Sequence, residues 1–214
     1  MAKSERRYVQ YGCGTVAPEL WTNFDVSPTL VIQKIPIIGF LLKRRLNILF
    51  PSNVLKGNIV AGLPFDENSC DGLFCSHVLE HLSLNDFRTA LQNSYKILKP
   101  GGIFRCIVPD LEDAARTYLT SLDNGNNLAS VDFIKIIHIG SEQRERGIIA
   151  RFVDLFGNSK HLWMWDIKSL SAEFQDAGFV NIRPCKFGDC EDEMFKHVEI
   201  ESRFENAVAI ECKK

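Results

Sequence analysis

Short apolar runs alternate with longer amphipathic segments along most of the chain. Strands are expected at 7–11, 22–26, 58–61, 71–75, 103–108, 180–185 and 207–211. Helices are expected between them: from a cap at Asn85 to Leu98, from a cap at Asp110 to about residue 122, and from Asp166 or Ser169 to Gly178. Strands and helices that alternate in this way predict an α/β fold with a largely parallel sheet.

Two segments exceed what a minimal sheet of this kind needs. Residues 29–56 are apolar and basic, and residues 123–164 combine helix-like and loop-like stretches. We therefore expect one domain over residues 1–214 with two insertions. Insertions at the carboxyl edge of a parallel sheet commonly form lids over a ligand.

The first insertion contains an apolar run at 35–42 followed by Lys43, Arg44 and Arg45. If this stretch is helical, Pro36 fits its first turn. An apolar face beside a basic cluster is compatible with peripheral membrane contact through 34–50, but a lid or dimer face packed on the body is the favoured interpretation. A run of eight apolar residues is too short for a membrane span, which needs about 20.

Composition narrows the class of protein. The 214 residues are 45% hydrophobic and carry a formal net charge of −2, so no nucleic-acid partner is expected. The seven cysteines form no Cys-x-x-Cys pair, and the first residues lead into no secretory signal. These features predict reduced, mostly buried thiols in a cytoplasmic protein.

A glycine-containing loop follows the first predicted strand. Gly12, Cys13 and Gly14 allow a sharp turn and the close approach of a ligand. Asp25 ends the next strand, where an acidic side chain binds ribose hydroxyls in dinucleotide-binding folds. A turn with a capping aspartate is the alternative. The loop lacks the third glycine of the nicotinamide-binding fingerprint, which argues against a dehydrogenase.

Further motifs follow in a recognisable order. Asn58 precedes Leu63-Pro64-Phe65, then come Asp-Gly-Leu-Phe-Cys-Ser-His-Val-Leu-Glu-His at 71–81 and Leu-Lys-Pro-Gly-Gly at 98–102. Over residues 8–110 this order resembles class I S-adenosylmethionine-dependent methyltransferases, most closely the type 11 group, and residues 161–212 resemble its usual tail. The resemblance implies a doubly wound, Rossmann-like sheet of seven strands with the last strand antiparallel.

The resemblance also implies roles for individual residues. Gly12, Cys13 and Gly14 would lie under the methionine part of S-adenosyl-L-methionine, and Asp25 would bind its ribose. The remaining cofactor contacts would be Asn58 and Ile59 at the adenine, and Ser76 and His77 at the methyl-donor end. This chain departs from the family in having Asn58 where aspartate is common, and in leaving only ten residues for the first helix before Asp25.

Methyl transfer requires alignment of the acceptor with the methyl group, and a hydroxyl acceptor also benefits from a base. His77 is the first candidate base and His81 the second, although His81 also fits an ordinary helical residue beside Glu80. A metal site of His77, Glu80 and His81 is the less favoured interpretation, with Asp110 or His161 as a further ligand; we expect no metal.

The expected activity is in-line methyl transfer to a small-molecule or glycan-type acceptor, with oxygen as the acceptor atom. Residues 163–165, Trp-Met-Trp, either line the acceptor pocket or pack beneath the last helix. Two alternatives remain open: a catalytically silent cofactor-binding or scaffold protein, and a methyltransferase that acts on RNA or protein.

Overall fold

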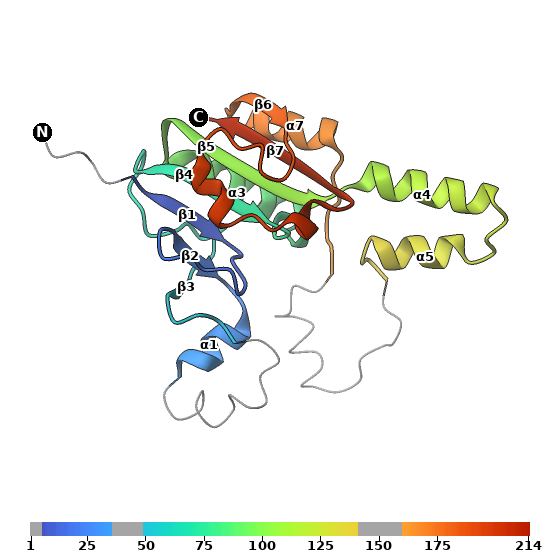
Figure 1. Cartoon of the computed structure of the whole chain (residues 1–214), viewed down its shortest axis with the longest axis horizontal. Coiled ribbons are helices and arrows are strands. Elements are labelled where there is room, and N and C mark those ends of the chain that lie inside the picture. The colour runs from blue at the N-terminus through green and yellow to red at the C-terminus, as the bar shows by residue number, and fades with distance from the viewer. Residues whose placement is uncertain (1–5, 36–48, 141–159) are drawn as a thin grey trace, which may run out of the picture.

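A computed structural model describes residues 6–35, 49–140 and 160–214. Its core is a seven-stranded sheet in the order β3-β2-β1-β4-β5-β7-β6. Strand β7 is antiparallel to β5 and β6, and the other neighbouring pairs are parallel. This confirms the expected fold class (Figure 1). The strands are β1 (Tyr8–Tyr11), β2 (Thr22–Asp25), β3 (Val54–Lys56), β4 (Cys70–Ser76), β5 (Leu98–Pro109), β6 (Val180–Pro184) and β7 (Ala207–Lys213).

Helices α3 (Leu84–Ile97) and α7 (Ile167–Asp176) cover one face of the sheet. Side chains alternate between the two faces of a strand. In β5, Phe104 and Cys106 therefore join the core beneath these helices, whereas Ile103 and Ile107 join a second core on the opposite face.

The opposite face is covered by short 3₁₀ helices, η2 (Glu193–His197) and η3 (Glu201–Phe204), from the segment between β6 and β7. Phe195 is fully buried there, and its ring centroid lies 5.4 Å from that of Trp21. The indole N–H of Trp21 donates to the carbonyl of Met194 at 3.1 Å. Residues 12–21 form no helix, as the short spacing before Asp25 predicts.

A salt-bridge network is buried on the same face. The guanidinium of Arg105 contacts the carboxylates of Glu199, Glu211 and Asp189, and the Arg105 side chain is only 1% exposed. Arg183 also donates to Glu211. This network links β5, β6 and β7 to the segment that covers them.

The expected strand at 58–61 is wrong, because the third strand is β3 at Val54–Lys56. The Asn58 side chain accepts a hydrogen bond from the backbone of Val60 at 2.9 Å and closes a turn. Ile59 and Leu63 lie in this loop, and their side chains are buried in the main core. The apolar pattern of the loop therefore resembles that of a strand. Asn85 is likewise not a cap: Ser83 caps α3 by accepting from Asp86. Asp110 and Asp166 are caps, as expected.

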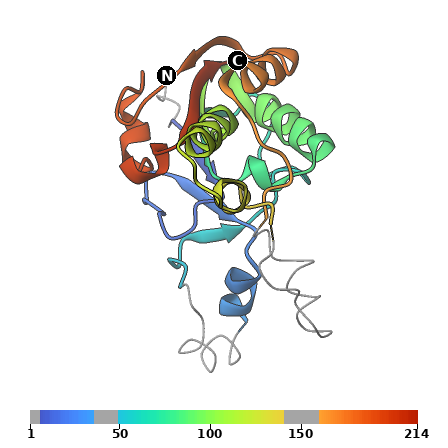
Figure 2. The same cartoon turned by 90° about the vertical axis from the view of Figure 1, so that its right-hand side faces the viewer.

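The two expected insertions are only partly described. Residues 29–56 include β3 and most of α1 (Pro28–Lys34), while the basic cluster at 43–45 and most of the expected membrane-contact segment 34–50 lie outside the described residues. Helices α4 (Leu111–Asp123) and α5 (Ala129–Ile136) project from the sheet as a pair, as Figures 1 and 2 show. In the described parts of the chain, no helix is long and apolar enough to cross a bilayer.

Candidate active site

The predicted site residues gather at the carboxyl ends of the central parallel strands. Strands β1 and β4 are neighbours, although β2 follows β1 in the chain, so the strand order reverses between them. Ligands bind open α/β sheets at this kind of switch point. The loop of Gly12 and Gly14 follows β1, and His77 follows β4.

The glycine loop has a backbone conformation that residues with a side chain rarely adopt. Gly12 and Gly14 have φ values of +69° and +55°. A Cβ on Gly12 would lie 1.9 Å from Cγ2 of Val78, so only glycine fits against the segment that follows β4. A Cβ on Gly14 would meet no atom within 4 Å. The loop therefore packs closely at Gly12 and is open at Gly14.

Asp25 holds this loop against the end of β2. Its Oδ2 accepts from the backbone N–H of Gly14 at 3.0 Å, and its Oδ1 accepts from the N–H of Ser27 at 2.8 Å. Next to these hydrogen bonds, the backbone N–H of Cys13 donates to the backbone carbonyl of Phe24 at 3.1 Å. Burial raises the pKa of the Cys13 thiol to about 12, and the negative charge of Asp25 adds to this effect.

Asn58 follows the end of β3, beside Asp25, and its side-chain oxygen already accepts a hydrogen bond. The Gly57 N–H donates to the backbone carbonyl of Asp25 at 3.1 Å, which brings the end of β3 to the end of β2. The Asn58 side chain is exposed, and its oxygen accepts from Val60. Ile59 is 4% exposed and packs in the main core.

Ser76 and His77 follow in the chain at the end of β4. The Ser76 hydroxyl is buried and has no hydrogen-bond partner in the described residues. His77 has a φ of +53°, and its backbone N–H donates to Ile107 in β5 at 2.9 Å. Its Nε2 donates to the carbonyl of Arg203 at 2.9 Å.

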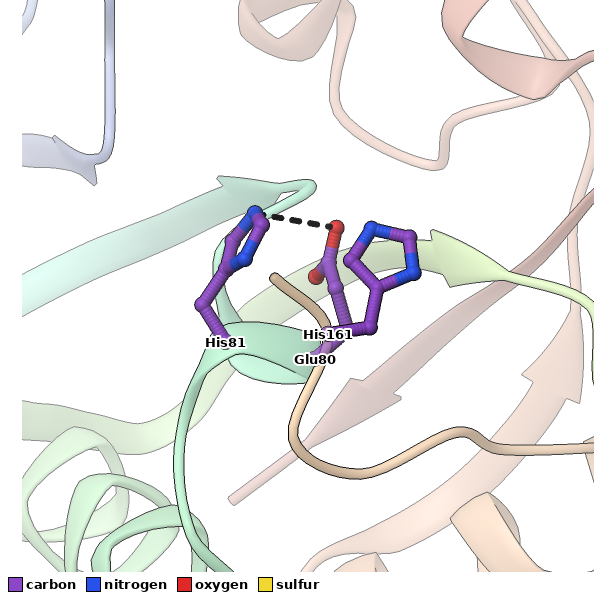
Figure 3. Close-up of side chains that lie close together, drawn as sticks. All are labelled: Glu80, His81 and His161. Atoms are coloured by element: carbon purple, nitrogen blue, oxygen red, sulfur yellow. Dashed lines mark ion pairs between the residues drawn. The ribbon is translucent and has the colours of Figure 1, made fainter. Parts of the chain in front are cut away.

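A histidine cluster surrounds Glu80, which lies in η1 (Leu79–His81). Nδ1 of His77 lies 3.4 Å and Nε2 of His81 lies 3.8 Å from Glu80 Oε1. His161 approaches from a distant segment and completes a group with Glu80 and His81 (Figure 3). Asp110 is not in this group, because its side chain caps α4.

The position of His161 is set by the backbone that follows it. The N–H groups of Leu162 and Trp163 donate to the carbonyl of Glu80 at 2.7 and 3.1 Å. Trp165 is 2% exposed and packs against Phe87 with ring centroids 4.2 Å apart, so it is a core residue, whereas Trp163 is 43% exposed. Burial lowers the pKa of His161; the charge of Glu80 opposes this shift.

Sequence reasoning missed two groups near this cluster. The ring centroid of His138 lies 5.1 Å from that of His161, and the Arg203 carbonyl orients His77. His138 follows α5 and Arg203 lies in η3, far from the recognised motifs in the chain. No local pattern in the sequence marks either residue.

The strand order, the glycine loop and the acidic end of β2 agree with the fold of class I S-adenosylmethionine-dependent methyltransferases. Residues 10–106 match the model of the methyltransferase domain family, type 11. This match implies S-adenosylmethionine as the cofactor.

Solved structures share the fold. An S-adenosylmethionine-dependent methyltransferase from Archaeoglobus fulgidus matches with a TM-score of 0.52 and 18% identity, over 98% of this chain and 86% of that one. A putative methyltransferase from Haloferax volcanii, solved in complex with the Trm112 activator, matches with a TM-score of 0.50 and 14% identity, over 99% and 83%.

A curated relative is the uncharacterized protein YBR225W of Saccharomyces cerevisiae. It is 27% identical over an alignment of 140 residues that covers 62% of this chain. The match spans only 15% of the length of the yeast protein.

The residues at the sheet edge fit the cofactor. Gly14 leaves open space above the loop, Asp25 presents two carboxylate oxygens beside it, and the buried Ser76 hydroxyl has no partner in the described residues. An acidic group beside a side-chain-free turn is suited to a ribose and its attached chain.

Proposed function

We propose that this chain transfers a methyl group from S-adenosyl-L-methionine to an oxygen of a small-molecule or glycan-type acceptor. The observation that carries the proposal is the hydrogen bond of Asp25 to the backbone of Gly14, which fixes an acidic group beside the glycine loop. The bound cofactor supplies an electrophilic methyl group on a sulfonium. Free cysteines that are buried or half-buried support a cytoplasmic location.

The chain's own residues bind and orient in this proposal. Gly12, Cys13 and Gly14 hold the methionine part, and Asp25 accepts hydrogen bonds from the ribose hydroxyls. Asn58 and Ile59 border the adenine. The Asn58 oxygen accepts from Val60, and its NH₂ group donates to no atom of the described residues.

His77 is proposed as the base that receives the proton of an acceptor hydroxyl. It follows β4 at the switch point, and Nε2–H donation to Arg203 leaves Nδ1 as the nitrogen that can accept a proton. His81 is the second candidate. Its Nδ1 donates to the carbonyl of Lys160 at 3.0 Å, so Nε2 is the nitrogen that can accept a proton.

Calorimetric titration with S-adenosylhomocysteine tests the cofactor site without any acceptor. We expect binding by the wild-type chain, a loss of at least tenfold in affinity for Asp25→Ala, and no change for Asp123→Ala, an exposed aspartate at the end of α4. Equal affinities for wild type and Asp25→Ala would remove Asp25 from the site.

A second candidate function is cofactor binding without catalysis, as in a scaffold. The Asn58 oxygen favours it, because the bond from Val60 occupies one of its two lone pairs and leaves a weaker acceptor for the adenine amine. Transfer of labelled methyl groups to a panel of hydroxylated small molecules and glycans separates the candidates. Transfer that falls about 10²–10⁴-fold in His77→Asn supports the enzyme, because asparagine tolerates the positive φ of this position. Binding without transfer to the panel, or to RNA or protein acceptors, supports the scaffold.

A further inference from the structure

The carboxylate of Glu80 is buried without hydrogen bonds in the described structure. Glu80 is 1% exposed, and neither Oε1 nor Oε2 has a hydrogen-bond partner among the described residues. A buried ionised carboxylate is costly unless a cation or several donors compensate it. Nδ1 of His161 is buried beside it and also has no partner there.

The neighbouring histidines turn acceptor nitrogens toward this carboxylate. His81 donates Nδ1–H to the Lys160 carbonyl, so its Nε2, 3.8 Å from Glu80 Oε1, carries a lone pair in the neutral ring. His77 donates Nε2–H to the Arg203 carbonyl and presents Nδ1 to the same oxygen at 3.4 Å. In the neutral rings these lone pairs face the carboxylate and repel it, and a cation between them, either a proton or a metal ion, removes the repulsion.

The arrangement also resembles the outer shell of a metal site. Histidine ligands commonly donate their second ring N–H to a backbone carbonyl, which fixes the ring and the tautomer. The Lys160 carbonyl does this for His81. Figure 3 shows the Glu80 carboxylate between the rings of His81 and His161.

We propose that Glu80, His81 and His161 bind a divalent transition-metal ion. One ligand atom from each residue lies within 4.8 Å of the others. Bonds of about 2.0–2.1 Å place neighbouring ligand atoms roughly 3–3.5 Å apart, so side-chain shifts of about 1 Å close the site. Two imidazoles and one carboxylate suit zinc and iron rather than magnesium, which takes mainly oxygen ligands.

The role of the ion rests on the proposed function. Three protein ligands leave coordination positions open, and a hydroxyl in such a position has a lowered pKa. Since η1 directly follows β4, the cluster shares the sheet edge with the glycine loop. In the transfer, the acceptor oxygen bonds to the methyl carbon, its proton passes to His77 or to solvent, and the electron pair of the broken C–S bond remains on sulfur.

Titration of the full chain, after dialysis against a chelator, with ZnCl₂ and separately with MnCl₂ tests the site. We expect one equivalent of zinc to bind with a dissociation constant of about 1 µM or tighter. Glu80→Gln and His161→Gln should weaken binding at least tenfold. His197→Gln is the matched control and should bind zinc as the wild type does, because His197 is exposed in η2 and is not part of the Glu80, His81 and His161 group.

Circular dichroism of each metal-free variant establishes whether it is folded. If Glu80→Gln does not fold, the zinc affinity of His161→Gln alone tests the site. S-adenosylhomocysteine is titrated in parallel. A wild-type chain that binds S-adenosylhomocysteine but neither metal overturns the metal site and leaves the proposed function intact. Undiminished zinc binding in both variants also overturns it. Zinc binding without S-adenosylhomocysteine binding supports the site and counts against the proposed function.

Discussion

The backbone N–H of Gly14 donates to Oδ2 of Asp25 at 3.0 Å, across eleven positions of sequence. The other carboxylate oxygen accepts from Ser27, so one side chain holds both the loop after β1 and the turn after β2. Asp25 therefore shapes the glycine loop in addition to any contact with a ribose.

Asp25→Asn tests this double role. Asparagine offers one acceptor oxygen and turns an NH₂ group toward one of the two backbone donors, which leaves that N–H unsatisfied. We expect the free energy of unfolding in urea to fall by about 1–3 kcal/mol. The affinity for S-adenosylhomocysteine should fall at least tenfold. A variant with wild-type stability would show that the hydrogen bonds from Gly14 and Ser27 to Asp25 contribute nothing to the free energy of unfolding.

Gly12→Ala and Gly14→Ala form a matched pair. Both place alanine at a positive φ, which costs roughly 1–2 kcal/mol. Only Gly12→Ala also drives a methyl group into Val78, and this overpacking adds about 1–3 kcal/mol. Urea unfolding should therefore show a larger loss for Gly12→Ala.

Adding Val78→Ala to Gly12→Ala provides the control for that clash. The double variant should be less destabilised than the sum of its two single variants, because removal of Val78 Cγ2 relieves the contact. Simple additivity would contradict the close approach of the loop to Val78.

Arg105→Met should be among the most destabilising substitutions outside the site. It leaves the buried carboxylates of Glu199 and Glu211 without their principal cation. Removal of one partner from such a network costs about 3–5 kcal/mol. Arg116→Ala breaks an exposed pair with Glu112 and should cost less than about 0.5 kcal/mol. Thermal and urea unfolding compare the two, and similar losses would contradict the burial argument.

Asp166 makes part of the stability of the chain dependent on pH. The Ser169 N–H donates to its carboxylate and lowers the pKa of Asp166 below the usual 3.8. Since the folded pKa is the lower one, the stabilisation is fully present above about pH 4 and is lost as the pH falls through the folded value.

Asp166→Ala should lose about 1 kcal/mol at pH 7 by removing the cap of α7. Asp166→Asn keeps a capping oxygen that does not titrate, so its stability at pH 7 should be close to wild type and should decline less between pH 4 and pH 2. Urea midpoints at both ends of this range measure the difference. Identical acid sensitivity of wild type and Asp166→Asn would exclude the ionised cap.

Local patterns in the sequence determined most of the strands and the chemistry at their ends. Short apolar runs marked β1, β2, β4 and the later part of β5, and the glycines and Asp25 marked the loop at the sheet edge. Capping residues placed the starts of α4 and α7, because an Asp side chain that accepts from N–H groups two or three positions on is a local interaction.

Tertiary structure decided what local patterns leave open. The sequence pattern of residues 58–61 predicts a strand, yet Ile59 lies in a turn with its side chain buried in the core. The short edge strand lies at Val54–Lys56 instead. The segment between β6 and β7, instead of a helix after β1, covers the second face of the sheet. His161 reaches Glu80, 81 positions earlier, only because Leu162 and Trp163 bind the Glu80 carbonyl. Contacts between distant segments depend on packing of the whole sheet, whereas caps, turns and strand alternation depend on neighbours in the chain.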